Sequence, residues 1–376
     1  MSTAFDEKIM RQLLALSMSE QGRTLPNPMV AAAVVQEGVI IATGVHQKSG
    51  EAHAEVLALA AAGNLSKGAT VYVTLEPCTH MGKTPPCVDA LIQAGVREVV
   101  FAMEDPNPQV QERSAEEALS NAGILVRKGI CREEAREYNR VFVTNMTHNR
   151  PYITLKSAIS KDMKIAEAPQ KLTQITGPVA NEDVHKLRRS CDGILVGIGT
   201  ILIDNPRLNC RLTETESSQD NPRPIIIDPD LRLSEDALFW TIARRQVRPR
   251  TNDEPSSKPI IVTRNKHNSK QATVITWDSP DPISFEWIWK QLYSLGFCHI
   301  LIEGGQGVTT ELLSQGEWDE WVVYQSNQVL GPHGVDLIES SSVSWESISA
   351  MPVFKKEPMG TEMKTIYRNS LGVRKR

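Results

Sequence analysis

The strongest constraint on the fold is a regular alternation of strand-like and helix-like segments through the first 130 residues. Short runs rich in β-branched residues alternate with runs rich in Ala, Leu and Glu, and several of the helix-like runs end at a glycine. The predicted strands are 29–35, 39–43, 70–75, 98–103 and 124–128, and the predicted helices are 10–19, 52–62, 88–93 and 114–121. Such alternation indicates a layered α/β domain with parallel strand pairings.

The chain of 376 residues is too long for one ordinary core, because a domain usually contains about 100–200 residues. A predicted helix at 132–145 leaves the first domain, and the sequence HNRP at 148–151 interrupts the pattern. We therefore expect one domain at 1–147 and a second at 148–376. The second α/β series comprises 152–158, 183–189, 193–196, 224–228, 259–263, 299–302 and 321–324.

Composition narrows the class of protein. A hydrophobic content of 40% and a charged content of 23% fit a soluble globular protein, and a net charge of −4 gives no general attraction to nucleic acid or to anionic membranes. No apolar run reaches the length of about 18 residues that a transmembrane helix needs. The six cysteines are scattered rather than arranged as a disulfide framework. We therefore expect a cytoplasmic protein.

One His, one Glu and two Cys carry the clearest chemical signal. His53, Cys78 and Cys87 offer the N and S ligands that zinc prefers, and a catalytic zinc site uses three protein ligands and one open position. Zinc lowers the pKa of water toward neutrality, and that chemistry needs a proton carrier, for which Glu55 is suitably placed. His-x-Glu followed by Pro-Cys and a second Cys is typical of zinc nucleobase deaminases, although eight residues here separate the cysteines.

Each of these residues alone has a structural explanation, since a buried Cys usually serves as a small hydrophobe. Their combination argues against coincidence. A closed structural zinc site would need a fourth ligand, and His80 is conceivable. His80 follows Cys78 by only two residues, however, so ligation by both would strain the loop.

At this point the first 147 residues resemble the deaminase half of the bifunctional riboflavin-biosynthesis deaminase/reductase family. The segments that carry the resemblance are PNPMVAAAVV, GVHQKSGEAHAEV, YVTLEPCTHMGKTPPC and DPNP. The resemblance implies a cytidine-deaminase-like α/β/α domain in which His53, Cys78 and Cys87 bind zinc and Glu55 shuttles protons. It also implies a phosphorylated pyrimidine substrate and a reductase domain after the deaminase.

The resemblance further implies the substrate pocket. Its residues would be Asn27, His46, Asp105 and Asn107 around the pyrimidine and ribose, with Lys83 and Thr84 at the ribose phosphate. Asn27 and the DPNP segment could instead be turn residues. The family usually has Gly at the position of Ala31 and a Gly-containing turn where this chain reads QERS at 111–114.

The second domain resembles the family's reductase, which has a dihydrofolate-reductase-like fold and uses NADPH. RPYITLK, ILVGIGTILIDNPRLNCRL, IIID and ILIEGGQGV carry this resemblance. The implied substrate residues are Arg188, Leu208, Arg211 and Glu303, with the two arginines at the phosphate. The implied cofactor residues are Ala158, Thr200, Asp204, Gly304, Gly305, Gln306 and Gly307. Glycines after a strand suit a pyrophosphate, but more often form a plain turn, and single arginines are more often surface residues.

This domain also departs from the family pattern in one region. SKDMK at 160–164 has Met163 where the family has Gly, and a Met can block a turn that needs a positive φ. QKLTQIT at 170–176 has Leu172 in place of a substrate-contacting Ser and Gln174 in place of a cofactor-contacting Trp.

The expected function is therefore deamination at zinc followed by NADPH-dependent reduction of the ribosyl group to a ribityl group. One alternative is an active deaminase whose reductase domain is impaired or acts on another substrate. Others are a zinc-dependent nucleic-acid editing protein, which the acidic balance argues against, and a non-catalytic scaffold. By analogy with the family we expect a homodimer or homotetramer, and neither a nucleic-acid nor a membrane partner.

Overall fold

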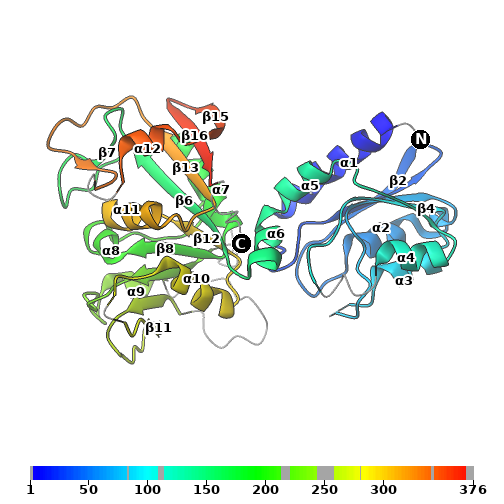
Figure 1. Cartoon of the computed structure of the whole chain (residues 1–376), viewed down its shortest axis with the longest axis horizontal. Coiled ribbons are helices and arrows are strands. Elements are labelled where there is room, and N and C mark those ends of the chain that lie inside the picture. Colours follow the sequence, from blue (N-terminus) through cyan, green and yellow to red (C-terminus); the bar gives the residue numbers. More distant parts are fainter. Residues whose placement is uncertain are drawn as a thin grey trace. The chain divides into compact units, whose positions relative to one another are not determined.

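The computed structural model describes residues 3–82, 84–108, 114–212, 221–243, 258–279, 281–339 and 343–369. The chain divides into two compact units, Met1–Asn149 and Arg150–Arg376, and each unit has its own central sheet (Figure 1). In the described part of the chain, no helix combines the length and the hydropathy that a membrane span requires.

The first unit contains a five-stranded sheet with the order β2-β1-β3-β4-β5. The expected parallel pairing holds for β3, β4 and β5, but β1 pairs antiparallel with both β2 and β3. Glu37 and Gly38 join β1 to β2 with φ values of 50° and 80°, and two consecutive positive φ angles suit a tight hairpin. The strands are β1 (Ala31–Gln36), β2 (Val39–Val45), β3 (Thr70–Leu75), β4 (Glu98–Met103) and β5 (Leu125–Lys128).

Two helices of this unit differ from the sequence prediction. The first begins at Thr3 rather than at residue 10, because its inward face carries Asp6, which accepts a hydrogen bond of 2.5 Å from Tyr72 Oη and so breaks the apolar pattern. The predicted helix at 132–145 is two helices that meet at Asn139, whose side chain bonds both the N–H and the C=O of Met29. The helices are α1 (Thr3–Ser17), η1 (Met18–Glu20), α2 (Ala54–Ala62), η2 (Gly63–Ser66), α3 (Cys87–Gln93), α4 (Ala115–Asn121), α5 (Arg132–Tyr138) and α6 (Arg140–His148).

The second unit contains a nine-stranded sheet with the order β11-β10-β9-β8-β12-β6-β13-β16-β15. Neighbours from β11 through β13 pair parallel, and β16 and β15 add an antiparallel hairpin. The sequence analysis missed this hairpin because β15 is rich in charge and contains Pro358. The strands are β6 (Tyr152–Ile159), β8 (Gly193–Gly197), β9 (Arg223–Ile227), β10 (Ile260–Thr263), β11 (Thr273–Thr276), β12 (His299–Ile302), β13 (Glu320–Gln325), β15 (Val353–Met359) and β16 (Glu362–Arg368), with β7 (Lys164–Ala166) and β14 (Val335–Asp336) in a separate pair.

Helices cover both faces of the large sheet. Along β12, Ile300 and Ile302 belong to one apolar cluster and Leu301 to another, so successive residues pack against opposite layers. A parallel sheet that is buried on both faces reads as a continuous apolar run, which explains why the sequence revealed these strands. The helices are α7 (Pro178–Ser190), α8 (Ile198–Asp204), α9 (Leu238–Ala243), α10 (Phe285–Ser294), α11 (Gln306–Gln315) and α12 (Trp345–Ser349).

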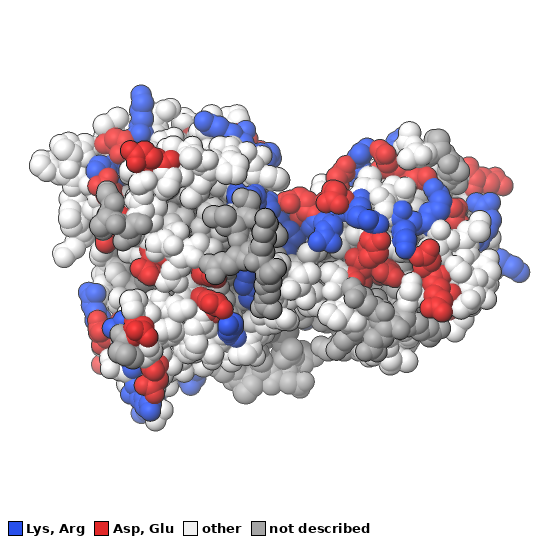
Figure 2. Space-filling view, viewed as in Figure 1, with Lys and Arg blue, Asp and Glu red and all other residues white. Residues whose placement is uncertain are grey.

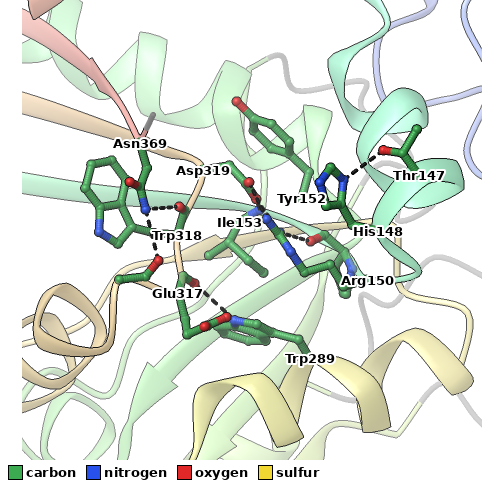
Figure 3. Close-up of polar contacts among 12 residues, drawn as sticks. Thr147, His148, Arg150, Tyr152, Ile153, Trp289, Glu317, Trp318, Asp319 and Asn369 are labelled. Atoms are coloured by element: carbon green, nitrogen blue, oxygen red, sulfur yellow. Dashed lines mark hydrogen bonds and ion pairs between the residues drawn. The ribbon is translucent and has the colours of Figure 1, made fainter. Parts of the chain in front are cut away.

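A polar cluster fixes the point at which the second unit begins (Figure 3). The guanidinium of Arg150 donates two hydrogen bonds of 2.6 Å to the carboxylate of Asp319, which also accepts one from the Ile153 N–H at 2.8 Å. Asn369 donates to the carbonyls of Gly316 and Trp318, both at 2.9 Å. The starts of β6 and β13 and the end of β16 are thereby held together.

Candidate active sites

Close packing of α2 on β2 positions the first group of predicted catalytic residues. His53 is the N-cap of α2 and Glu55 lies in its first turn. Gly44 on β2 makes this approach possible, because a Cβ at that position would lie 2.2 Å from the carbonyl oxygen of Ala54. Cys87 begins α3, and its N–H donates to the sulfur of Cys78 at 3.3 Å.

The predicted zinc ligands lie together. The ligand atoms of His53, Cys78 and Cys87 are all within 4.8 Å of one another, and His53 Nδ1 is 3.2 Å from Cys87 Sγ and 3.5 Å from Cys78 Sγ. A tetrahedral zinc with bonds of about 2.1 Å to N and 2.3 Å to S separates these atoms by about 3.6 Å, so the set fits the ion. Among the described residues His80 does not join this group, which leaves the three-ligand arrangement of a catalytic site.

Glu55 is buried beside these ligands, with 3% of its surface exposed. Burial raises the pKa of its carboxyl group to about 7. A carboxyl group whose pKa lies near neutrality can both accept and donate a proton, which is what a proton carrier needs. Hydrogen bonding from Cys87 lowers the pKa of the Cys78 thiol, which favours the thiolate that binds metal.

A cavity of about 320 Å³ opens beside the ligands, and the described residues predicted to bind the pyrimidine and ribose all line it. His46 Nδ1 lies 3.2 Å from the Ala52 carbonyl oxygen, which can only accept, so this nitrogen carries the proton. His46 Nε2 therefore accepts from the amide of Asn27 at 3.0 Å. Burial lowers the pKa of His46, which keeps the ring neutral. The cavity is lined by Asn27, His46, Thr84, Asp105 and Asn107, together with His53, Glu55 and Cys78.

The Asp105 loop is held by a residue that the sequence analysis did not assign. Glu76 accepts hydrogen bonds of 3.2 Å from the N–H groups of Asp105 and Ala115, and Asp105 in turn accepts from the Asn107 N–H at 2.9 Å. The signal available in the sequence was a Glu directly after a buried strand and before Pro-Cys. Burial raises the pKa of Asp105 to about 6.

Thr84 lines the same cavity, but its hydroxyl also contacts a predicted zinc ligand, at 3.3 Å from His53 Nε2. Lys83 lies outside the described residues, as does most of the segment 111–114. Ala31, where the family has Gly, is fully buried in β1 and donates its N–H to Thr74 Oγ1.

The second unit contains a larger cavity, of about 560 Å³, at the carboxyl ends of β6, β8 and β12. Ligands of parallel α/β sheets bind at this edge. Gly304 lets α11 begin close to β12, because a Cβ there would lie 2.8 Å from Val308. Gln306 and Gly307 begin α11 and do not line the cavity, unlike the other predicted residues. Those that line it are Ala158, Arg188, Thr200, Asp204, Leu208, Arg211, Glu303, Gly304 and Gly305.

Half-buried charged side chains line this cavity. Arg188 donates two hydrogen bonds of 2.7 Å to the Glu303 carboxylate, and, despite burial, the charges of Arg188 and Lys156 hold the Glu303 pKa at about 2. Lys156 lines the cavity, and its ammonium makes no hydrogen bond or ion pair among the described residues. Burial lowers the pKa of Lys156. The sequence analysis did not assign Lys156, although it ends the matching segment RPYITLK.

The segment that departs from the family pattern folds in an unexpected way. Met163 adopts the positive φ, 65°, that its side chain disfavours, so the turn persists without glycine. Asp162 braces this turn by accepting hydrogen bonds from Ser160 Oγ and from the N–H groups of Leu330 and Gly331. Leu172 lines the cavity although 70% of its surface is exposed, whereas Gln174 does not line it.

Comparison with known proteins assigns both units to known families. Residues 3–103 match the family described as the cytidine and deoxycytidylate deaminase zinc-binding region, and residues 151–352 match the RibD C-terminal domain. The riboflavin biosynthesis protein RibD of Aquifex aeolicus is 38% identical over 367 residues, which cover 96% of this chain and 98% of its own. The chain belongs to the RibD family.

Other members support the same assignment. RibD of Escherichia coli is 36% identical over 355 residues, which cover 93% of this chain and 95% of its own. A deaminase/reductase structure from Thermotoga maritima is 33% identical, covers 98% of this chain and 99% of its own, and has a TM-score of 0.86. Acinetobacter baumannii RibD, at 28% identity, covers 98% of this chain and 100% of its own, with a TM-score of 0.85.

These matches confirm the predicted fold class and activities. The first unit is a cytidine-deaminase-like domain, and the second is the dihydrofolate-reductase-like domain of the RibD family. The chain is therefore a bifunctional riboflavin-biosynthesis enzyme with a zinc-dependent deaminase and an NADPH-dependent reductase.

Proposed function

We propose that this RibD-family chain catalyses two consecutive steps on one phosphorylated pyrimidine. Residues 1–147 would deaminate 2,5-diamino-6-(5-phosphoribosylamino)pyrimidin-4(3H)-one, and residues 148–376 would reduce 5-amino-6-(5-phosphoribosylamino)uracil. The Thermotoga maritima relative is a diaminohydroxyphosphoribosylaminopyrimidine deaminase/5-amino-6-(5-phosphoribosylamino)uracil reductase. The proposal rests on the two cavities. One lies beside the candidate metal ligands His53, Cys78 and Cys87, and the other is lined by Lys156 and Glu303.

In the deaminase cavity, His53, Cys78 and Cys87 would hold the zinc ion. Zinc supplies Lewis acidity, which makes water nucleophilic near neutral pH. Glu55 takes a proton from the attacking water and delivers it to the departing amino group, which leaves as ammonia. Asn27 and the neutral His46 present fixed donors and acceptors to the pyrimidine, since each orients the other.

In the reductase cavity, conversion of a ribosyl to a ribityl group breaks the C1′–O4′ bond, adds a hydride at C1′ and adds a proton at O4′. NADPH supplies the hydride. Lys156 donates the proton to O4′, because its half-buried ammonium lines this cavity without a hydrogen-bond partner among the described residues and its pKa is lowered. Glu303, held by Arg188, keeps a negative charge near the ammonium and binds the ribose hydroxyls.

The phosphate would be bound by arginine. The charge of Arg188 is largely balanced by Glu303, whereas Arg211 and the neighbouring Arg207 line the cavity without an ion pair among the described residues, and we assign the phosphate to Arg211. Among the described residues, Arg211 bonds only the side chain of Asn209, which is neutral. Leu208 lies buried beside it and would contact the pyrimidine. Ala158, Thr200, Asp204 and the turn at 304–307 would contact NADPH.

The proposed substrate is a small molecule rather than a nucleic acid. On the face shown in Figure 2, acidic and basic side chains are interspersed, which does not favour binding of a polyanion along a continuous strip. We also propose a cytoplasmic location and a homo-oligomeric assembly. All six cysteines are unpaired, as a reducing compartment requires. Light scattering of the purified protein would give the assembly mass.

A two-step assay tests the proposed function. Purified protein receives the diamino substrate, and ammonia release and NADPH oxidation are followed separately. Replacing Glu55→Gln should lower ammonia release by about 10²–10⁴-fold, while zinc content and reduction of added deaminated intermediate stay unchanged. Unchanged ammonia release would refute the role of Glu55. Absence of NADPH oxidation with the intermediate would instead support a reductase domain that is impaired or acts on another substrate.

A further inference from the structure

The loop between Cys78 and Cys87 places the hydroxyl group of Thr84 beside His53, on the side of the ring that faces away from the two cysteines. The two ring nitrogens of His53 face different groups: Nδ1 faces the sulfurs of Cys87 and Cys78, and Nε2 lies 3.3 Å from Thr84 Oγ1. The loop is closed around this contact, because the Gly82 N–H donates to the Thr84 carbonyl at 3.2 Å and the Val88 N–H donates to the Cys78 carbonyl at 3.3 Å.

The position of the ring proton decides which group donates the hydrogen bond between His53 Nε2 and Thr84 Oγ1. A metal at Nδ1 occupies the lone pair of that nitrogen, so the ring proton lies on Nε2. His53 then donates to Thr84 Oγ1. Histidines that bind metal usually donate their second N–H to a carboxylate, a carbonyl or a water, and this contact fixes the tautomer and the ring orientation. Among the described residues, Thr84 is the group within bonding distance of His53 Nε2.

We propose that Thr84 is a positioning residue for the zinc site. Its hydroxyl holds the His53 ring with Nδ1 toward the two cysteines. This inference rests on the proposed role of His53 as a zinc ligand. The rings of His46 and His53 form a T-shaped pair with a centroid distance of 5.4 Å, so packing restrains the plane of the His53 ring and the hydroxyl fixes its rotation.

The same hydroxyl also faces the substrate cavity. Once it accepts from His53, its own proton is available to an acceptor in the cavity, and the substrate's ribose phosphate supplies oxygen acceptors. Thr84 thus joins the proposed substrate site to the metal site through a single oxygen atom.

Zinc affinity of the full chain tests this inference, since it does not depend on turnover. Thr84→Val keeps the shape of the side chain and removes the hydroxyl, whereas Thr84→Ser keeps the hydroxyl. Competition with a chromophoric chelator should show zinc binding weakened by about 10–100-fold in Thr84→Val and restored to within a few-fold of the parent in Thr84→Ser. The far-UV circular dichroism spectrum of each variant serves as the folding control.

Each outcome has a distinct meaning. Equal zinc affinity of Thr84→Val and the parent protein overturns the inference. Equal weakening in Thr84→Val and Thr84→Ser overturns it as well, because the loop rather than the hydroxyl would then be responsible. Failure of the parent protein to bind one zinc per chain would instead refute the proposed function of His53, Cys78 and Cys87.

Discussion

The two cavities differ in how their polar side chains are bonded. In the deaminase cavity the polar side chains hold one another, as Asn27 holds His46 and Thr84 contacts His53. In the reductase cavity, by contrast, Lys156 projects from β6 without a partner among the described residues, and Arg211 has only a neutral one. The first cavity is thus organised before substrate arrives, whereas the second keeps charge unpaired for its ligands.

This difference has an energetic meaning. Removing an ammonium from water without a hydrogen-bond partner is costly, and this cost lowers the pKa of Lys156, although the nearby Glu303 carboxylate opposes the shift. A phosphorylated substrate and a phosphorylated cofactor would each relieve the excess positive charge. The affinity of the reductase cavity for its ligands should therefore depend strongly on ligand charge. The rate of the deaminase should depend mainly on its metal and on Glu55.

The largest effect is expected at Lys156. Replacing Lys156→Met removes the proposed proton donor and should lower the rate of NADPH oxidation by about 10²-fold or more, with ammonia release unchanged. Burial and Arg188 lower the pKa of Lys156, and Glu303 opposes them. Because the protonated form is needed, the reductase rate should fall as pH rises through a value below the ordinary lysine pKa of about 10.4.

A pH profile of the maximal reduction rate checks this expectation. A rate that stays constant up to the ordinary lysine range would contradict the assigned role. A loss of both activities in Lys156→Met would contradict the contrast between the two cavities, because it would show that they do not act independently.

The two sites also differ in how well they could be predicted from the sequence. The zinc ligands and Glu55 lie in short motifs whose spacing reflects one turn of helix and one loop, so local patterns were sufficient. The reductase site draws on strand ends far apart in the chain, and Lys156 looks like any residue at the end of an apolar strand. Only the sheet order, which places β12 between β6 and β8, brings it beside Glu303.

Two further points concern local structure. Gln306 and Gly307 begin α11 and do not line the cavity, so their contact with the cofactor stays a prediction. Asp6 and Asn139 shifted helix boundaries through polar contacts with distant segments, which no local pattern records.

An intermediate effect is expected at Arg211. Replacing Arg211→Gln removes the positive charge proposed to bind the phosphate and should raise the KM for the phosphorylated intermediate by about 10–100-fold, since a hydrogen bond to a charged group is worth about 1.5–3 kcal/mol. The maximal rate should change less. Arg232→Gln is the matched control, because Arg232 is exposed and does not line the cavity. An equal change in KM for a dephosphorylated analogue would contradict a phosphate contact.

The smallest effect concerns the turn at Met163 in the second unit. Met163 holds a φ of 65°, and a left-handed conformation costs an L-residue about 1–2 kcal/mol that glycine does not lose. Met163→Gly and Met163→Ala both remove the side chain's packing. Glycine should therefore be the more stable of the two by about 1 kcal/mol, which reverses the usual order and corresponds to about 2–4 °C in Tm.

Intrinsic fluorescence measures this difference in the intact chain, because all seven tryptophans lie in the second unit. Thermal unfolding of the two variants then reports on that unit alone, and the far-UV signal of the whole chain shows whether the first unit is altered. If Met163→Ala were the more stable variant, the turn would relax without strain. The bracing of Asp162 by Leu330 and Gly331 would then be sufficient to hold any side chain at this position.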